Sequence, residues 1–170
     1  MSVWMETQVR YNLELGHTGQ VLYRTGLLQK KTQKEQLGYL YGFIQTQLTR
    51  EHRLTLQHTY KYSSHNLSHR ARLEGRFFER DIPERQDGAR FRYLLRADNR
   101  FDFVVWNEVF LHLGKTDWNN GMLWDRNRLF LGLKKNWGDS NRMEWGYLNQ
   151  FIPQSTRDVS EHLIVFYFFF

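Results

Sequence analysis

The sequence contains no cysteine and little proline. Its 170 residues include no Cys and two Pro, which excludes a disulfide scaffold, thiolate metal ligands and a proline-rich linker. No stretch approaches the ~18 consecutive apolar residues that a transmembrane helix requires. The N-terminus has no basic segment followed by an apolar one, so we do not expect a signal peptide within this sequence. If the protein is exported, we expect that its signal peptide has been removed.

Helical periodicity is also missing. No stretch of eleven or more residues keeps apolar side chains at positions i, i+3, i+4 and i+7, the spacing typical of an amphipathic helix. Apolar residues nevertheless make up 41% of the chain and aromatic residues 16%, so the chain has enough apolar surface to fold. Its length predicts one domain, residues 1–170.

Apolar and polar residues alternate with a period of two along most of the chain, a pattern typical of strands with two different faces. Many of these segments are longer than the ~5–6 residues of an ordinary globular strand and match the ~9–11 residues that cross a bilayer. The alternation predicts ten strands, at residues 3–14, 21–28, 37–44, 53–62, 67–77, 90–97, 101–113, 126–134, 142–151 and 162–170.

The connections between these segments differ in length. Three links from an odd to an even strand are long, at residues 81–87, 114–123 and 153–161, whereas the even-to-odd links are mostly short. The first two odd-to-even links, 16–19 and 48–51, are short exceptions. This asymmetry is typical of an even-stranded outer-membrane barrel with both termini in the periplasm. We therefore predict an all-β fold, an antiparallel up-and-down transmembrane β-barrel of about ten strands.

Glycine indicates which face of the strands points inward. Inside a narrow barrel, glycine makes room for bulky neighbours, whereas on an open solvated face it only weakens the strand. Gly75 lies on the apolar face, but the charged face carries Gly26, Gly38, Gly42, Gly132 and Gly146. We therefore expect the charged face to line the interior. The residues predicted to face lipid include Tyr39, Leu54, Leu73, Tyr93, Leu131 and Trp145.

Aromatic residues near the strand ends support the membrane interpretation. An interfacial girdle of aromatic side chains is typical of such barrels, and the residues predicted to form it are Tyr62, Phe77, Phe101, Trp124 and Trp137.

The face predicted to point inward carries fourteen basic and six acidic residues. An unpaired buried charge costs several kcal/mol, and the five donors of a guanidinium suit shared carboxylates. We expect Arg70, Arg72, Arg76, Arg90 and Arg92 to pair with Glu74, Glu108 and Glu144 across neighbouring strands. The complete predicted interior network is Arg53, Arg70, Arg72, Glu74, Arg76, Arg90, Arg92, Glu108, Arg126, Arg128 and Glu144.

Three functions are compatible with this pattern. Ten strands enclose little more space than the eight whose interior is just filled by side chains, which favours a closed barrel with a structural role or with loops that bind a ligand. A basic lumen would alternatively form a narrow anion-preferring pore. A soluble, lipocalin-like ligand-binding barrel would place the charged face outside.

Little in the sequence indicates catalysis. Neither Gly-x-Ser-x-Gly nor His-Glu-x-x-His occurs, and Ser64-His65-Asn66 with Ser68-His69 fits turn chemistry better than a nucleophile and its base. We predict no enzyme activity, catalytic residue or cofactor. His58 lies on the apolar face and is interpreted as an interfacial or oligomer-contact residue.

Two other binding functions are also disfavoured. Asp117, Asn119, Asn120 and Asp125 could supply oxygen ligands for Ca²⁺, but a solvated loop explains them better, and no metal site is predicted. The basic residues recur at period two with apolar residues between them, which argues against a nucleic-acid surface.

Six motifs in a fixed order carry a family resemblance. They are Glu51-His52-Arg53, residues 69–77 (HRARLEGRF), Arg90-Phe91-Arg92-Tyr93, Asn107-Glu108-Val109-Phe110, residues 125–129 (DRNRL) and residues 144–150 (EWGYLNQ). From about Arg24 onward, the chain resembles a family of bacterial outer-membrane β-barrels known only as a domain of unknown function. The resemblance implies a fold and a location in the outer membrane, but no activity and no catalytic residues. It leaves open whether relatives have further N-terminal residues.

The C-terminal strand also resembles a known signal. Ile164, Phe166, Phe168 and Phe170 alternate up to the end of the sequence, as in the signature by which bacterial outer-membrane barrels are recognised for insertion. The expected partners are therefore outer-membrane lipids, lipopolysaccharide and the barrel-insertion machinery. We expect a monomer.

Overall fold

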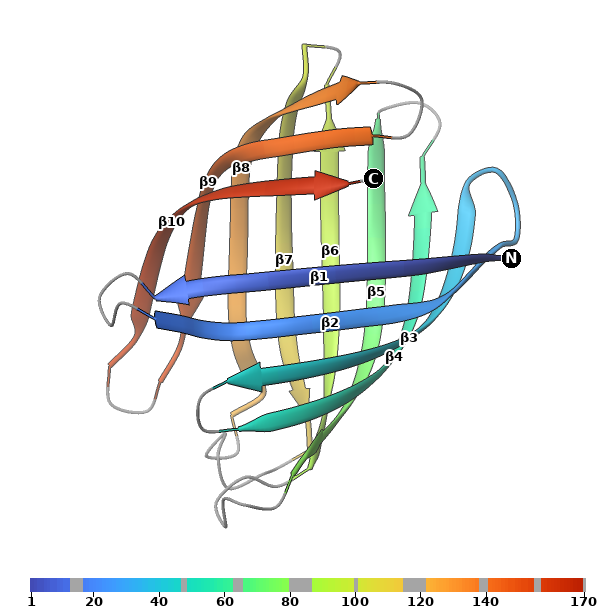
Figure 1. Cartoon of the computed structure of the whole chain (residues 1–170). Helices are drawn as coiled ribbons and strands as arrows, with labels where there is room; N and C mark the ends of the chain where they lie inside the picture. The colour runs from blue at the N-terminus through green and yellow to red at the C-terminus, as the bar shows by residue number, and fades with distance from the viewer. Residues whose placement is uncertain are drawn as a thin grey trace.

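The computed structural model describes residues 1–12, 17–46, 49–62, 66–79, 87–99, 101–114, 122–137, 141–154 and 157–169. No helix among these residues is long and apolar enough to cross a membrane. They form ten strands (Figure 1), namely β1 (Ser2–Asn12), β2 (His17–Lys30), β3 (Glu35–Thr46), β4 (Arg50–Lys61), β5 (Leu67–Phe78), β6 (Gly88–Asp98), β7 (Phe103–Leu113), β8 (Trp124–Trp137), β9 (Asn141–Ile152) and β10 (Val159–Phe169).

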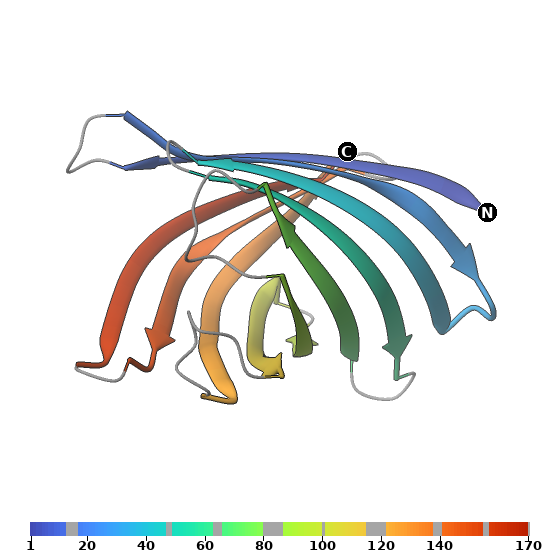
Figure 2. The ribbon, with the colours of Figure 1, turned by 90° about the horizontal axis from the view of Figure 1, so that it is seen from below.

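The ten strands form one antiparallel sheet in which each strand pairs with its neighbours in sequence, in the order β1 to β10. The sheet curls strongly, so that its two edge strands, β1 and β10, come to the same side of the molecule (Figure 1 and Figure 2). Among the described residues, no ladder joins β1 to β10. The predicted all-β, up-and-down arrangement of ten antiparallel strands is confirmed.

Some strands begin earlier than the alternation indicated. β2 begins at His17 rather than at residue 21, and β8 begins at Trp124 rather than at residue 126. β10 begins at Val159, which pairs with Ile152 of β9, rather than at residue 162. In each case the backbone ladder continues past the residues whose side chains alternate, because ladder hydrogen bonds do not depend on side-chain polarity.

The two faces of the sheet differ in burial. In β3, Leu40 and Ile44 point inward and are 4% and 2% exposed. Tyr39, on the opposite face of the same strand, is 52% exposed. Leu54, Leu73, Tyr93 and Leu131 are likewise exposed on the outer face, and Trp145 is half-buried there. The predicted girdle residues Tyr62, Phe77, Phe101, Trp124 and Trp137 are all exposed.

Two glycines that face each other on β8 and β9 leave room for neighbouring atoms that a side chain would displace. Gly132 pairs with Gly146. A Cβ atom on Gly132 would lie 2.3 Å from the ring of Phe130, and a Cβ atom on Gly146 would lie 2.3 Å from the carbonyl oxygen of Leu131. These inward glycines therefore make room for neighbours, as the sequence predicted.

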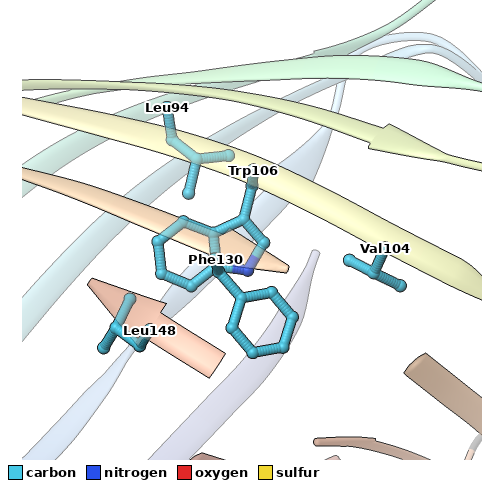
Figure 3. Close-up of a cluster of buried hydrophobic side chains, with 5 residues drawn as sticks. All are labelled: Leu94, Val104, Trp106, Phe130 and Leu148. Atoms are coloured by element: carbon cyan, nitrogen blue, oxygen red, sulfur yellow. The ribbon is translucent and has the colours of Figure 1, made fainter. Parts of the chain in front are cut away.

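An apolar cluster fills part of the interior. It consists of Leu94, Val104, Trp106, Phe130 and Leu148, which come from β6 to β9 and point toward one another (Figure 3). The rings of Trp106 and Phe130 stack with centroids 5.2 Å apart, and Val165 and Tyr167 of β10 pack against the cluster. Burying a side chain of this size contributes roughly 1.5–3 kcal/mol, so the cluster links the later strands from within.

The turn between β6 and β7 is held by its own side chains. Asn99 Oδ1 accepts hydrogen bonds from the backbone N–H groups of Phe101 at 2.7 Å and Phe103 at 3.0 Å. Asp102 adopts a positive φ of 64°, which Asp tolerates better than most residues. This short turn keeps β6 and β7 in register.

Candidate functional site: the charged interior

Strands β4 to β9 direct many charged side chains into the interior. We call this set of side chains the charged interior. The register places Thr55, Glu74 and Arg90 side by side on β4, β5 and β6, and it places Arg72 opposite Arg92. Neighbouring residues on the same face of paired strands lie close enough for their side chains to touch. The charged residues that alternate along each strand therefore also lie beside charged residues of the next strand, and together they form a lattice on the inner face.

Glu74 and Glu108 each join two arginines in this lattice. The Glu74 carboxylate lies 2.6 Å from Arg90 and 2.6 Å from Arg92. Glu108 lies 2.8 Å from Arg92 and 3.4 Å from Arg70. Both carboxylates are almost fully buried. The pairs of Arg90 and Arg92 join neighbouring strands as expected, and they make Arg92 a bridge between two carboxylates. The contact between Arg70 on β5 and Glu108 on β7 instead spans β6.

Arg76 pairs with a carboxylate outside the predicted set. Glu51 lies 2.6 Å from Arg76 and 2.5 Å from Arg53. The register sets Arg76 directly opposite Arg53, so that Glu51, two residues before Arg53, lies diagonally between the two guanidinium groups. The expected partners of Arg76 were Glu74, Glu108 and Glu144, and the structure corrects this.

Glu144 also differs from the prediction, because neither of its partners lies on a neighbouring strand: one is on β6 and the other is on its own strand, β9. It binds Arg96 of β6 at 2.6 Å and Arg142 of β9 at 2.9 Å. β6 and β9 are not neighbours in the sheet, so the pair with Arg96 crosses the interior. This contact arises from the curl of the sheet and not from strand pairing.

Two acidic members of the charged interior were missed by the sequence reasoning. Asp125 was assigned to a long loop, but it lies in β8, buried, 2.9 Å from Arg90 and 3.1 Å from Arg126. A register shift between Phe110 and Leu111 of β7 faces this position, and a bulge of this kind breaks strict alternation. Asp125 and Arg126 therefore both contact interior charges.

Asp98, at the end of β6, is the second missed carboxylate. It lies 2.9 Å from Arg96 and 3.5 Å from Lys134. Asp98 is separated by an even number of positions from Arg90, Arg92 and Arg96, so it lies on the same inward face of β6. This spacing could have identified Asp98 as an interior residue. With both residues included, the basic excess in the interior is smaller than the sequence count implied.

Phe110 is an aromatic centre among these charges. It is 2% exposed, and its ring centroid lies 4.5 to 5.8 Å from four guanidinium carbons, those of Arg90, Arg92, Arg126 and Arg128. Cation–π contacts strengthen when they are desolvated. Phe110 shares the inward parity of Glu108, and this signal could have placed it in the interior.

The predicted interior residues all lie on one face. Arg72, for which a carboxylate partner was expected, instead donates its Nε–H to Gln57 Oε1 at 2.7 Å. Arg128 Nε likewise donates to Gln150 Oε1 at 2.5 Å. Amide oxygens therefore supplement the carboxylates as acceptors, a role for glutamine that the sequence reasoning did not include.

Two histidines of β4, His52 and His58, lie on the outer face near the two ends of the strand. His58 contacts Glu35 at 3.0 Å. His52 contacts Glu79 at 3.2 Å, and Arg50 lies 3.3 Å from the same carboxylate. The hydrogen bonds from His52 and Arg50 lower the pKa of Glu79, which lies beyond the end of β5.

Other candidate residues fall partly outside the described structure. Ser64, His65, Asp117, Asn119 and Asn120 lie outside the described residues. Within the part of the chain that the structure describes, no group of three or more His, Asp or Glu side chains is placed to hold a metal ion.

Comparisons with known proteins agree with this architecture. A solved structure, the KdgM porin in complex with disordered oligogalacturonate, is similar with a TM-score of 0.64 and 11% sequence identity, and the similarity covers 96% of this chain and 82% of that one. At this identity the likeness concerns the fold.

An uncharacterized protein of Methylorubrum extorquens is 36% identical over 94 residues. The matched stretch covers 53% of this chain and 41% of that relative. Residues 1–161 match the family described as "Protein of unknown function (DUF2490)". The resemblance seen in the sequence is thereby confirmed, and the chain belongs to the DUF2490 family.

Proposed function

We propose that this protein is a small β-barrel of the bacterial outer membrane whose interior is filled by side chains. The observation that carries the proposal is the inverted distribution of polarity. Leu54 and Leu56 are 56% and 53% exposed on the outer face, whereas Glu74 and Arg90 are 2% and 4% exposed on the inner face. A soluble lipocalin-like barrel would have the opposite arrangement, because water would solvate the charges outside.

The filled interior supports a closed barrel. The ion pairs of Glu51, Glu74 and Glu108 lie in one part of the interior, and the apolar cluster around Phe130 lies in another. Interior side chains that contact one another in this way leave little space for a wide aqueous channel, which needs ~16–18 strands. In this role the barrel is a stable membrane scaffold, and no catalytic residue is assigned.

The outer face defines the expected partners. Its apolar side chains would contact outer-membrane lipid and lipopolysaccharide. The exposed Ile164, Phe166 and Phe168 of β10 would be read by the barrel-insertion machinery. We propose that the mature protein is a monomer in this membrane.

Heat modifiability after refolding tests the membrane proposal. A barrel refolded in detergent should migrate on a gel at a different position when unboiled than when boiled, and its circular dichroism should show β-structure. Recovery of a folded monomer in plain buffer without detergent would contradict the proposal and would favour a soluble, lipocalin-like barrel.

A narrow anion-preferring pore is the second candidate function. It is supported by the predominance of guanidinium groups over carboxylates in the interior and by the similar fold of a porin that was solved with oligogalacturonate, an anion. Rings of basic side chains select anions. Planar-bilayer recording separates the two candidates, since discrete anion-selective steps that Arg72→Glu abolishes would favour the pore, and a silent bilayer would favour the filled barrel.

A further inference from the structure

Arg72 is a buried cation without a carboxylate partner among the described residues. Its side chain is 5% exposed. Its one hydrogen bond within the described residues runs from Nε to the amide oxygen of Gln57 at 2.7 Å. The two terminal amino groups of its guanidinium therefore have no protein acceptor there. Since an ionised side chain left unpaired in the interior is strongly destabilising, this position requires an explanation.

The charges around Arg72 have mostly the same sign. Arg92 is its direct cross-strand neighbour, and Arg70 lies two residues away on the same face of β5. Glu108 is already held by Arg92 and Arg70, so it does not compensate Arg72.

The two neighbouring arginines also have unused donors. The Nε–H groups of Arg70 and Arg92 are buried and make no hydrogen bond. Leaving a buried donor unsatisfied costs ≈ 1–3 kcal/mol, and more for a charged group. Three adjacent guanidinium groups on β5 and β6 thus have free donors on one face of the sheet.

Two arginines at the edge of this group are partly exposed. The side chain of Arg70 points inward and is 29% exposed, and that of Arg24 is 14% exposed. Water therefore reaches the edge of the group formed by Arg70, Arg72 and Arg92, which we call the arginine group.

We propose that the arginine group binds an oxyanion. A phosphate, sulfate or carboxylate offers several acceptor oxygens to the planar donors of guanidinium groups, and its negative charge would offset the repulsion among three arginines. The ligand is a free oxyanion or the headgroup of an anionic lipid. The inference goes beyond the proposed function, because a filled barrel requires no ligand, and it does not require that ions cross the barrel.

The test is anion-dependent stabilisation of the refolded, full-length protein in zwitterionic detergent. Inorganic phosphate is titrated at constant ionic strength, maintained with sodium chloride. A ligand that binds the folded state raises the unfolding midpoint in a saturable way. We expect this rise in the wild type, its loss in Arg72→Gln, and its retention in Lys61→Gln. The control removes the same charge from the inner face of β4, outside the arginine group.

Arg72→Gln gives a second readout without phosphate. Because the substitution removes repulsion from Arg70 and Arg92, its unfolding midpoint should not fall below that of the wild type. Titration calorimetry of the wild type with phosphate provides a measurement that does not depend on any variant. Vesicles of zwitterionic lipid, with and without an anionic phospholipid, distinguish the two sources of the oxyanion.

Saturable binding of phosphate identifies a free oxyanion as the ligand. Stabilisation by the anionic phospholipid alone, lost in Arg72→Gln, identifies a lipid headgroup. The absence of both effects in the wild type, or an equal effect in Arg72→Gln and Lys61→Gln, would overturn the proposal.

Discussion

The interior is filled in two chemically different ways. Around β4 to β6, carboxylates such as Glu74 lie between pairs of arginines, whereas around β6 to β9 the apolar cluster packs Trp106 on Phe130. Both arrangements bury side chains between the strands, but they should respond differently to substitution. Loss of one carboxylate removes an ion-pair partner from two buried cations at once, whereas loss of one apolar side chain leaves a cavity. The charged part should therefore be the less tolerant of substitution.

Glu74→Ala should have the largest effect. It leaves Arg90 and Arg92 without a carboxylate that lies 2.6 Å from each, and breaking a buried pair costs about 3–5 kcal/mol. Equilibrium unfolding by urea in lipid vesicles measures the loss of the free energy of unfolding. Glu79→Ala, which removes an exposed carboxylate beyond the end of the same strand, is the matched control. Unchanged midpoints for both Glu74→Ala and Glu108→Ala would show that the charges are not coupled.

Leu148→Ala should have a somewhat smaller effect in the apolar cluster. Leu148 is 5% exposed, and truncation of a buried leucine costs about 2–5 kcal/mol, depending on how far the cavity collapses. The same unfolding assay applies, with Leu131→Ala on the outer face of β8 as the control. A cost above that of Glu74→Ala would reverse the comparison between the two parts of the interior.

Gly146→Ala tests the close approach that lets β9 pack beside β8. The new Cβ would lie 2.3 Å from the Leu131 carbonyl oxygen and 2.5 Å from the Gly132 Cα, so backbone has to move, at a cost of about 1–3 kcal/mol. Gly75→Ala is the control, because its Cβ would meet only the Phe77 ring, at 3.3 Å. Equal unfolding midpoints for the two variants would rule out a packing role for Gly146.

The smallest effect should appear in acid. The pKa of Glu79 is lowered from its ordinary value of 4.5, so its stabilising contribution is complete above that value and is lost as the pH falls through the lowered pKa. Because Glu79 is exposed, the change should be slight. The difference in unfolding midpoint between wild type and Glu79→Gln should shrink below pH 4.5. A difference that stays constant with pH would contradict this assignment.

The fold could be predicted from patterns within short stretches of sequence, but the ion-pair partners of several charged residues could not. Period-two alternation is visible in sequence, so the ten strands, their order and their inward and outward faces could be predicted, and the inward position of Gly132 and Gly146 could be inferred. The contact between Arg96 and Glu144 depends on how far the sheet curls. The burial of Asp125 depends on a bulge opposite Phe110, which side-chain alternation does not reveal.

The central claim is that the apolar face contacts lipid while the charged face is enclosed. Because the chain has no cysteine, single-cysteine variants along β4 can each carry one nitroxide label without background. In lipid bilayers, labels at Leu54→Cys and Leu56→Cys should show high accessibility to oxygen, which concentrates in the apolar membrane core, and labels at Gln57→Cys and Thr59→Cys should show low accessibility. Uniform accessibility along β4, or the reverse alternation, would contradict the account.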